Sequence, residues 1–127
     1  MLRASAAVAL GSAAGGVLRF WLSVAAERIW PQGLPIGTIA VNVAGSFAIG
    51  LIAAMTISRP DSLGGPLGHQ ALMAGLLGGF TTFSAFSLQT LLLAQDGRWG
   101  LAVVNVVASI ALCLLAVAAG WNLGRTV

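Results

Sequence analysis

Four long apolar segments run along the chain of 127 residues, and short stretches rich in Gly, Pro and charged side chains separate them. Each segment holds about the 20 apolar residues that a helix needs to cross a bilayer. The pattern predicts an all-α integral membrane protein, a single four-span membrane domain with both termini on one side of the membrane. We expect the spans at about residues 4–26, 38–57, 70–93 and 99–121.

The composition excludes most soluble proteins. Charged residues make up 7% of the chain, whereas soluble domains are about one quarter charged. A secretory signal peptide is an alternative interpretation of the first segment, but its apolar run continues well past Gly16 and no polar domain follows it. Tryptophans lie near the predicted span ends, where their rings prefer the headgroup level, at Trp21, Trp30, Trp99 and Trp121.

The charges are few and scattered. The net charge is +3, but the arginines are isolated along the chain and form no basic patch, so we expect no nucleic-acid partner. Cytoplasmic loops usually carry the excess of Lys and Arg. Here the side that holds the termini carries Arg3, Arg59 and Arg125, and the other side carries Arg28 and Arg98. With so small a bias, the charge pattern leaves open both a fixed orientation and insertion in two orientations.

Polar residues inside the spans are costly in lipid and are therefore the functional candidates. On the first span, Arg19 ends a face of small and polar residues, and it either snorkels to the interface or lies at the mouth of an anion path. On the second span, Thr38 and Asn42 share one helical stripe, and the Asn42 amide can donate two hydrogen bonds. On the fourth span, Asn105 and Ser109 form a thin polar line.

The third span contains the strongest local signal. Adjacent Gly78 and Gly79 are followed by the β-branched Thr81 and Thr82, which are poor material for the middle of a helix. We therefore expect the helix to break here. The carbonyls freed by a break can hold an alkali cation in a membrane, and the nearby hydroxyls can donate to an anion. The alternative is a continuous helix that packs through Gly75 and Gly79.

Phenylalanines recur every three residues through this region, at Phe80, Phe83 and Phe86. Such a stripe is usually packing, but aromatic ring edges carry positive partial charge and can line an anion route. No Asp, Glu, Lys or His lies inside a predicted span, and no catalytic set of residues is visible. The inventory fits a small anion that moves passively, and we expect no enzymatic activity.

Three motifs resemble those of the Fluc (CrcB) fluoride channels: GGVLR at 15–19, GTIAVNVAGSF at 37–47 and GGFTTFSAFS at 78–87. The likeness covers nearly the whole chain. It implies a dual-topology, antiparallel homodimer in the cell inner (plasma) membrane, whose two pores export toxic fluoride down its gradient. It also implies a sodium ion that is bound at the dimer centre and is not transported.

The resemblance carries residue roles with it. The sodium would be held by the backbone carbonyls of Gly78 and Thr81. Related channels often have an aromatic hydroxyl where this chain has Asn105, and Cys113 would likewise replace a hydroxyl. The polar stripes and the resemblance together assign to the fluoride pathway Arg19, Thr38, Asn42, Thr82, Phe83, Ser84, Phe86, Asn105 and Ser109.

Two other functions share this span count. A small dual-topology exporter of cationic drugs would need a carboxylate inside a span, and the chain has none there. A non-transporting assembly subunit would instead dock its glycine faces on a larger membrane partner. The narrow polar stripes cannot enclose a wet path within one chain, so we expect them to meet a second copy across an interface within the lipid.

Overall fold

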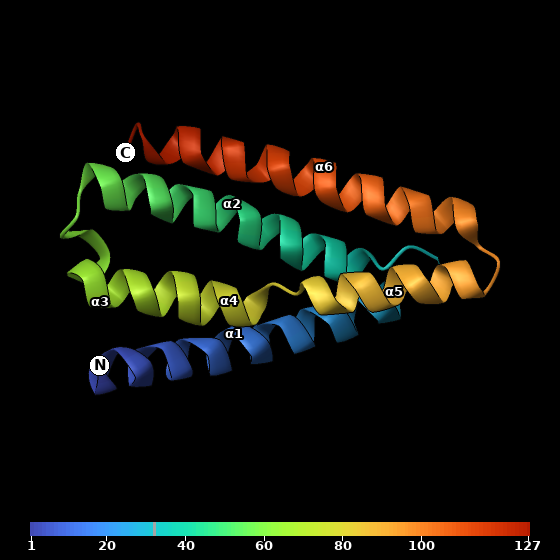
Figure 1. The fold of residues 1–127 in the computed structure, drawn as a ribbon, viewed down its shortest axis with the longest axis horizontal. Helices are drawn as coiled ribbons and strands as arrows, with labels where there is room; N and C mark the ends of the chain where they lie inside the picture. Colours follow the sequence, from blue (N-terminus) through green and yellow to red (C-terminus); the bar gives the residue numbers. More distant parts are fainter. Residues whose placement is uncertain (32) are drawn as a thin grey trace.

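The computed structural model describes residues 1–31 and 33–127, and regular structure in this part of the chain is entirely helical. The long helices run roughly side by side, and both termini lie at the same end (Figure 1). In chain order, the elements are α1 (Leu2–Ile29), α2 (Ile36–Ser58), the 3-10 turn η1 (Ser62–Gly64), α3 (Gly65–Gln70), the π-helical segment η2 (Ala71–Leu77), α4 (Gly78–Phe80), α5 (Phe83–Gln95) and α6 (Trp99–Gly124).

Four stretches are long and apolar enough to cross a membrane, which confirms the predicted all-α architecture with four spans. They are Leu2–Ile29, Ile36–Ser58, Ser62–Gln95 and Trp99–Gly124. Between 6% and 22% of the residues in the most apolar window of each span are buried within the chain. Most of the apolar surface therefore faces outward, toward lipid or another protein.

Glycines bring α1 and the first half of the third span into backbone contact. A methyl group on Gly15 would overlap the Leu76 carbonyl, and one on Gly79 would overlap the Ser12 carbonyl. The Ser12 hydroxyl also donates to the Gly75 carbonyl over 3.3 Å. In lipid, helix association depends on such close packing and on interhelical hydrogen bonds, because apolar side chains gain nothing by leaving the lipid tails.

The pair α2 and α6 is built in the same way. A methyl group on Gly50 would overlap the Val117 carbonyl, and one on Gly120 would overlap the Phe47 carbonyl. The two helices therefore pack with their backbones almost touching along much of their length.

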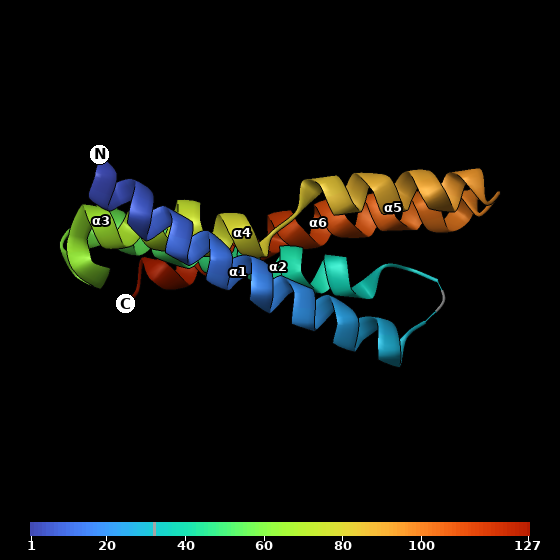
Figure 2. The same cartoon turned by 90° about the horizontal axis from the view of Figure 1, so that it is seen from below.

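The third span changes its neighbour midway. Its first half, η2 and α4, packs on α1, whereas α5 packs on α6; Figure 2 shows the chain crossing from one to the other between α4 and α5. At the crossing, Thr81 (ψ 157°) and Thr82 (φ −152°, ψ 113°) have extended backbones. Before the crossing, η2 is a π-helix, a form that is rare and concentrated at functional sites.

The α1 contact can be tested with two neighbouring glycines. A Cβ on Gly15 meets backbone atoms of the third span, whereas a Cβ on Gly16 meets nothing within 4 Å. We expect Gly15→Ala to destabilise the protein by about 1–3 kcal/mol through overpacking, and Gly16→Ala to be neutral or slightly stabilising. Thermal unfolding in detergent measures both, and equal midpoints would contradict close packing of Gly15 on the third span.

Candidate functional site

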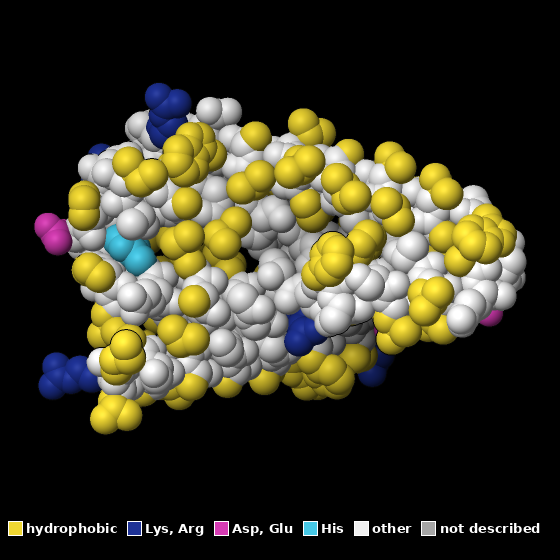
Figure 3. Space-filling model, viewed as in Figure 1, with side chains coloured by type: hydrophobic (Ala, Val, Ile, Leu, Met, Phe, Trp, Pro, Cys, Tyr) yellow, Lys and Arg dark blue, Asp and Glu magenta, His cyan; other side chains and the backbone are white. Residues whose placement is uncertain are grey.

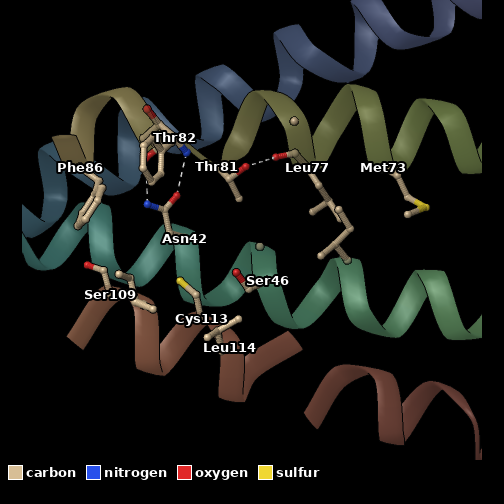
Figure 4. Close-up of a pocket in the computed structure, with 15 residues that line it drawn as sticks. Asn42, Ser46, Met73, Leu77, Thr81, Thr82, Phe86, Ser109, Cys113 and Leu114 are labelled. Carbon is tan, nitrogen blue, oxygen red and sulfur yellow. Dashed lines mark hydrogen bonds between the residues drawn. The ribbon is translucent and has the colours of Figure 1, made fainter. Parts of the chain in front are cut away.

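A groove of about 460 Å³ opens between α2, the third span and α6. Figure 3 shows this face hollowed near its middle, and Figure 4 shows the side chains that line it. The groove brings together predicted site residues from three spans. Those that line it are Asn42, Gly78, Thr81, Thr82, Phe83, Phe86 and Ser109.

The Asn42 side chain bridges α2 to the extended segment of the third span. Its Nδ2 donates to the Thr82 carbonyl over 3.0 Å, and its Oδ1 accepts from the Thr82 backbone N–H over 2.8 Å (Figure 4). One amide thus satisfies both backbone groups of a residue that leaves the helical ladder. Without such partners, exposed backbone groups at membrane depth would be costly.

The same bridge changes the hydrogen bonding of Gly78. In a continuous helix the Thr82 N–H would donate to the Gly78 carbonyl four residues earlier, but here it donates to Asn42. The Thr81 N–H and hydroxyl both donate to the Leu77 carbonyl, each over 2.9 Å. The Gly78 carbonyl is therefore released from its helical donor beside the groove.

Thr82 also starts α5. Its hydroxyl accepts from the Ala85 N–H over 3.1 Å, which caps the helix, and it lies 3.2 Å from the Ser84 hydroxyl. A cap of this kind is worth about 1 kcal/mol. Ser84 itself is exposed and does not line the groove, so its link to the groove passes through the Thr82 hydroxyl.

The two phenylalanines of α5 differ in exposure. Phe86 is 9% exposed, whereas Phe83 is 78% exposed. Their ring centroids lie 5.3 Å apart with planes tilted by 49°, and both residues line the groove. In a membrane-spanning chain, an aromatic side chain with this exposure faces lipid or another protein.

On α6, only part of the predicted polar line faces the groove. Ser109 and Cys113 line it, but Asn105 is 1% exposed and lies behind it. Asn105 donates to the Thr90 hydroxyl over 2.8 Å and accepts from the Ser109 hydroxyl over 3.4 Å. Both ends of its amide are thus occupied by side chains of α5 and α6.

Two predicted pathway residues lie elsewhere. Thr38 is one turn before Asn42 on α2 and lines a separate small cavity of about 40 Å³, together with Glu27 and Gln89. Arg19 is half-buried, and its Nε is enclosed without a hydrogen-bond partner among the described residues. Neither side chain contributes to the walls of the main groove.

The sequence pattern did not single out Thr90 or the apolar walls of the groove. A polar residue inside a span is a usable signal for Thr90, which also donates to the Phe86 carbonyl over 2.7 Å. The apolar walls carry no such signal, because Leu, Ile and Met look the same whether they face a groove or lipid. They include Ile49, Met73, Leu77, Ile110 and Leu114.

The amide bridge can be tested by hydrogen exchange. Removing the side chain in Asn42→Ala leaves the Thr82 N–H without its acceptor, so we expect that amide to exchange at least about tenfold faster. Asn122→Ala, at the exposed end of α6, is the matched control and should leave the Thr82 rate unchanged. Equal protection of Thr82 in all three proteins would show that another group holds the segment.

Comparison with known proteins gives consistent matches. The family described as CrcB-like protein, Camphor Resistance (CrcB), matches residues 6–121. A protein of Paramagnetospirillum magneticum named fluoride-specific ion channel FluC is 54% identical over 112 residues, which are 88% of each chain. Proteins with that name from Opitutus terrae and Paracoccus denitrificans are 52% and 45% identical, over 87% and 93% of this chain and 83% and 91% of their own.

The family match extends across all four spans, and the residues of the groove lie within the matched range. The sequence identity to these relatives is high enough to establish membership of their family. The relatives are named as ion channels rather than enzymes. The chain belongs to the CrcB family, and with four helices long and apolar enough to cross a membrane it is a multi-pass protein of the cell membrane.

Proposed function

We propose that the protein is a passive, fluoride-selective channel that exports fluoride across the cell membrane and relieves fluoride toxicity. The observation that carries the proposal is the groove, whose polar side chains are hydroxyls, one amide and the Cys113 thiol, set beside phenylalanine rings. The relatives named as fluoride-specific ion channels support the choice of ion.

The chemistry of the groove suits a small anion. Among the residues that the structure describes, no Asp, Glu, Lys, Arg or His lines it. Fluoride is a strong hydrogen-bond acceptor, so hydroxyl donors and positive ring edges can replace part of its hydration shell. Because no full positive charge holds the ion, it can also leave, as conduction requires.

A second copy of the chain completes the pathway in this proposal. The groove of one chain is open on one side, and the exposed Phe83 stands at its edge. An antiparallel homodimer would pair two grooves around a two-fold axis and give two pores, one per groove. The nearly even division of Arg between the two ends fits insertion in both orientations.

Along each pore we assign successive positions to the predicted residues. Asn42, Thr82, Phe83, Phe86 and Ser109 line the groove itself. Ser84 reaches it through the Thr82 hydroxyl, and Asn105 reaches it through Ser109. Thr38 and Arg19 lie outside the groove, and we place them toward a mouth of the path, where the Arg19 guanidinium would attract anions.

The oxygens beside the groove fit a structural sodium ion. Gly78 and Thr81 both line it, and the Gly78 carbonyl has lost its helical donor. No group of His, Cys, Asp and Glu able to hold a metal occurs among the described residues, so carbonyls are the available ligands. Two chains would supply two carbonyls each, a neutral oxygen set that suits an alkali cation, and the ion would join the two chains without being transported.

Efflux from liposomes tests the channel. We expect purified protein to release fluoride much faster than chloride, each followed with an ion-selective electrode, because the groove offers hydrogen-bond donors and no fixed charge. Phe83→Ile removes the ring edge and should lower fluoride efflux at least about tenfold, whereas Leu88→Ile, an exposed residue of the same helix, should not. Equal slow leak of both ions would refute the channel.

The sodium proposal has its own test. Replacing all sodium by N-methyl-D-glucamine should lower fluoride efflux several-fold, and restoring sodium should recover it, since the carbonyl set loses its ion. Glu27→Gln removes an exposed carboxylate outside the groove and should leave this dependence unchanged. Efflux that is indifferent to the cation would remove the role assigned to Gly78 and Thr81.

A further inference from the structure

Three side chains form a continuous hydrogen-bond chain that begins at Ser109 on the wall of the groove and continues behind it. The Ser109 hydroxyl donates to Asn105 Oδ1 over 3.4 Å, and Asn105 Nδ2 donates to Thr90 Oγ1 over 2.8 Å. The Thr90 hydroxyl in turn donates to the Phe86 carbonyl over 2.7 Å. Each member donates to the next, so the chain has a direction, from the groove toward the backbone of α5.

This direction conflicts with anion binding at Ser109. A serine has a single O–H donor, and here it points at Asn105, so Ser109 presents only acceptor lone pairs to the groove that it lines. An anion needs a donor. The bond of 3.4 Å is also longer than the usual range for a hydroxyl donor, whereas the two other bonds in the chain are short. The weakest bond is therefore the one at the groove.

The chain can exist with the opposite direction. If the Asn105 amide turns over, its Nδ2 donates to Ser109 Oγ and its Oδ1 accepts from the Thr90 hydroxyl. The Ser109 O–H is then free to donate into the groove. The Phe86 carbonyl loses the Thr90 hydroxyl but keeps the Thr90 backbone N–H, its partner in the helical ladder of α5. Every member of the chain thus keeps a partner in either direction.

We propose that Asn105 and Thr90 are positioning residues that set the direction of the Ser109 hydroxyl. In the direction described, the hydroxyl donates to Asn105; in the reversed direction, an anion in the groove receives the Ser109 O–H. Asn105 is 1% exposed and lies outside the groove, so it acts on the ion only through Ser109. This inference rests on the proposed anion pathway and adds to it a reversible donor.

Thr90 is essential to both directions, since its hydroxyl accepts from Asn105 in one and donates to it in the other. Removing that hydroxyl leaves one end of a buried amide without a partner, which fixes or misplaces the amide. Thr90→Val keeps the shape of the side chain and removes only this hydroxyl. Thr90→Ser keeps the hydroxyl and is the rescue variant.

The experiment is a double-mutant cycle on fluoride efflux from liposomes. We expect Thr90→Val to lower efflux about threefold to tenfold, Thr90→Ser to retain it, and Thr90→Val to have no further effect in a Ser109→Ala background. Thr56→Val is the matched control, because the Thr56 hydroxyl makes the same bond to the carbonyl four residues earlier, at 2.8 Å, but lies on α2 outside the chain of bonds. Thr90→Ala repeats the test if the valine variant is not monodisperse on a sizing column.

The outcomes separate this inference from the proposed function. If the unmodified protein shows fluoride-selective efflux and Thr90→Val matches it, the positioning role is wrong and the channel stands. An equal loss from Thr90→Val in the unmodified protein and in the Ser109→Ala background would also overturn the inference, because it would show a general packing role that does not act through the Ser109 hydroxyl. Absence of fluoride-selective efflux from the unmodified protein would overturn the proposed function and this inference together.

Discussion

In hydrocarbon, a backbone N–H or C=O without a partner is costly, and the bridge from Asn42 to Thr82 pairs two such groups with one side chain. The amide pairs both backbone groups of Thr82 and so stabilises an extended segment between α4 and α5. That segment allows the third span to leave α1 and continue on α6. The groove, the released Gly78 carbonyl and the position of Phe83 all follow from this crossing.

Contacts between helix backbones hold the four spans together without a large core. Glycines bring α1 against the third span and α2 against α6, and the side chains that are fully enclosed are few, with Val41 and Asn105 the largest. A chain that buries so little of itself leaves most of its apolar surface to be covered by lipid or by another protein. In the proposed homodimer, the exposed Phe83 beside the open groove is the place where the second copy would contribute most to the site.

The four spans could be predicted from the sequence because hydropathy over some 20 residues depends only on local composition. Asn42 and the Gly-Gly-Phe-Thr-Thr run could be recognised as site candidates in the same way, because polar residues and adjacent glycines within an apolar span are visible in the local sequence. Their pairing could not be derived from spacing, because residues 40 positions apart meet only once helices have packed. The π-helical η2, the apolar groove walls and the contact of Thr90 with Asn105 likewise depend on tertiary packing.

The scarcity of charge in the groove sets a constraint on how any anion could move through it. A buried arginine would hold an anion tightly, and a carboxylate would repel it, whereas hydroxyls and an amide can act as donor or acceptor by rotating. Such groups can stay paired with one another when the ion is absent, as Ser109 and Asn105 are. Each would then exchange a protein partner for the ion with no buried group left unpaired, so binding and release would both cost little.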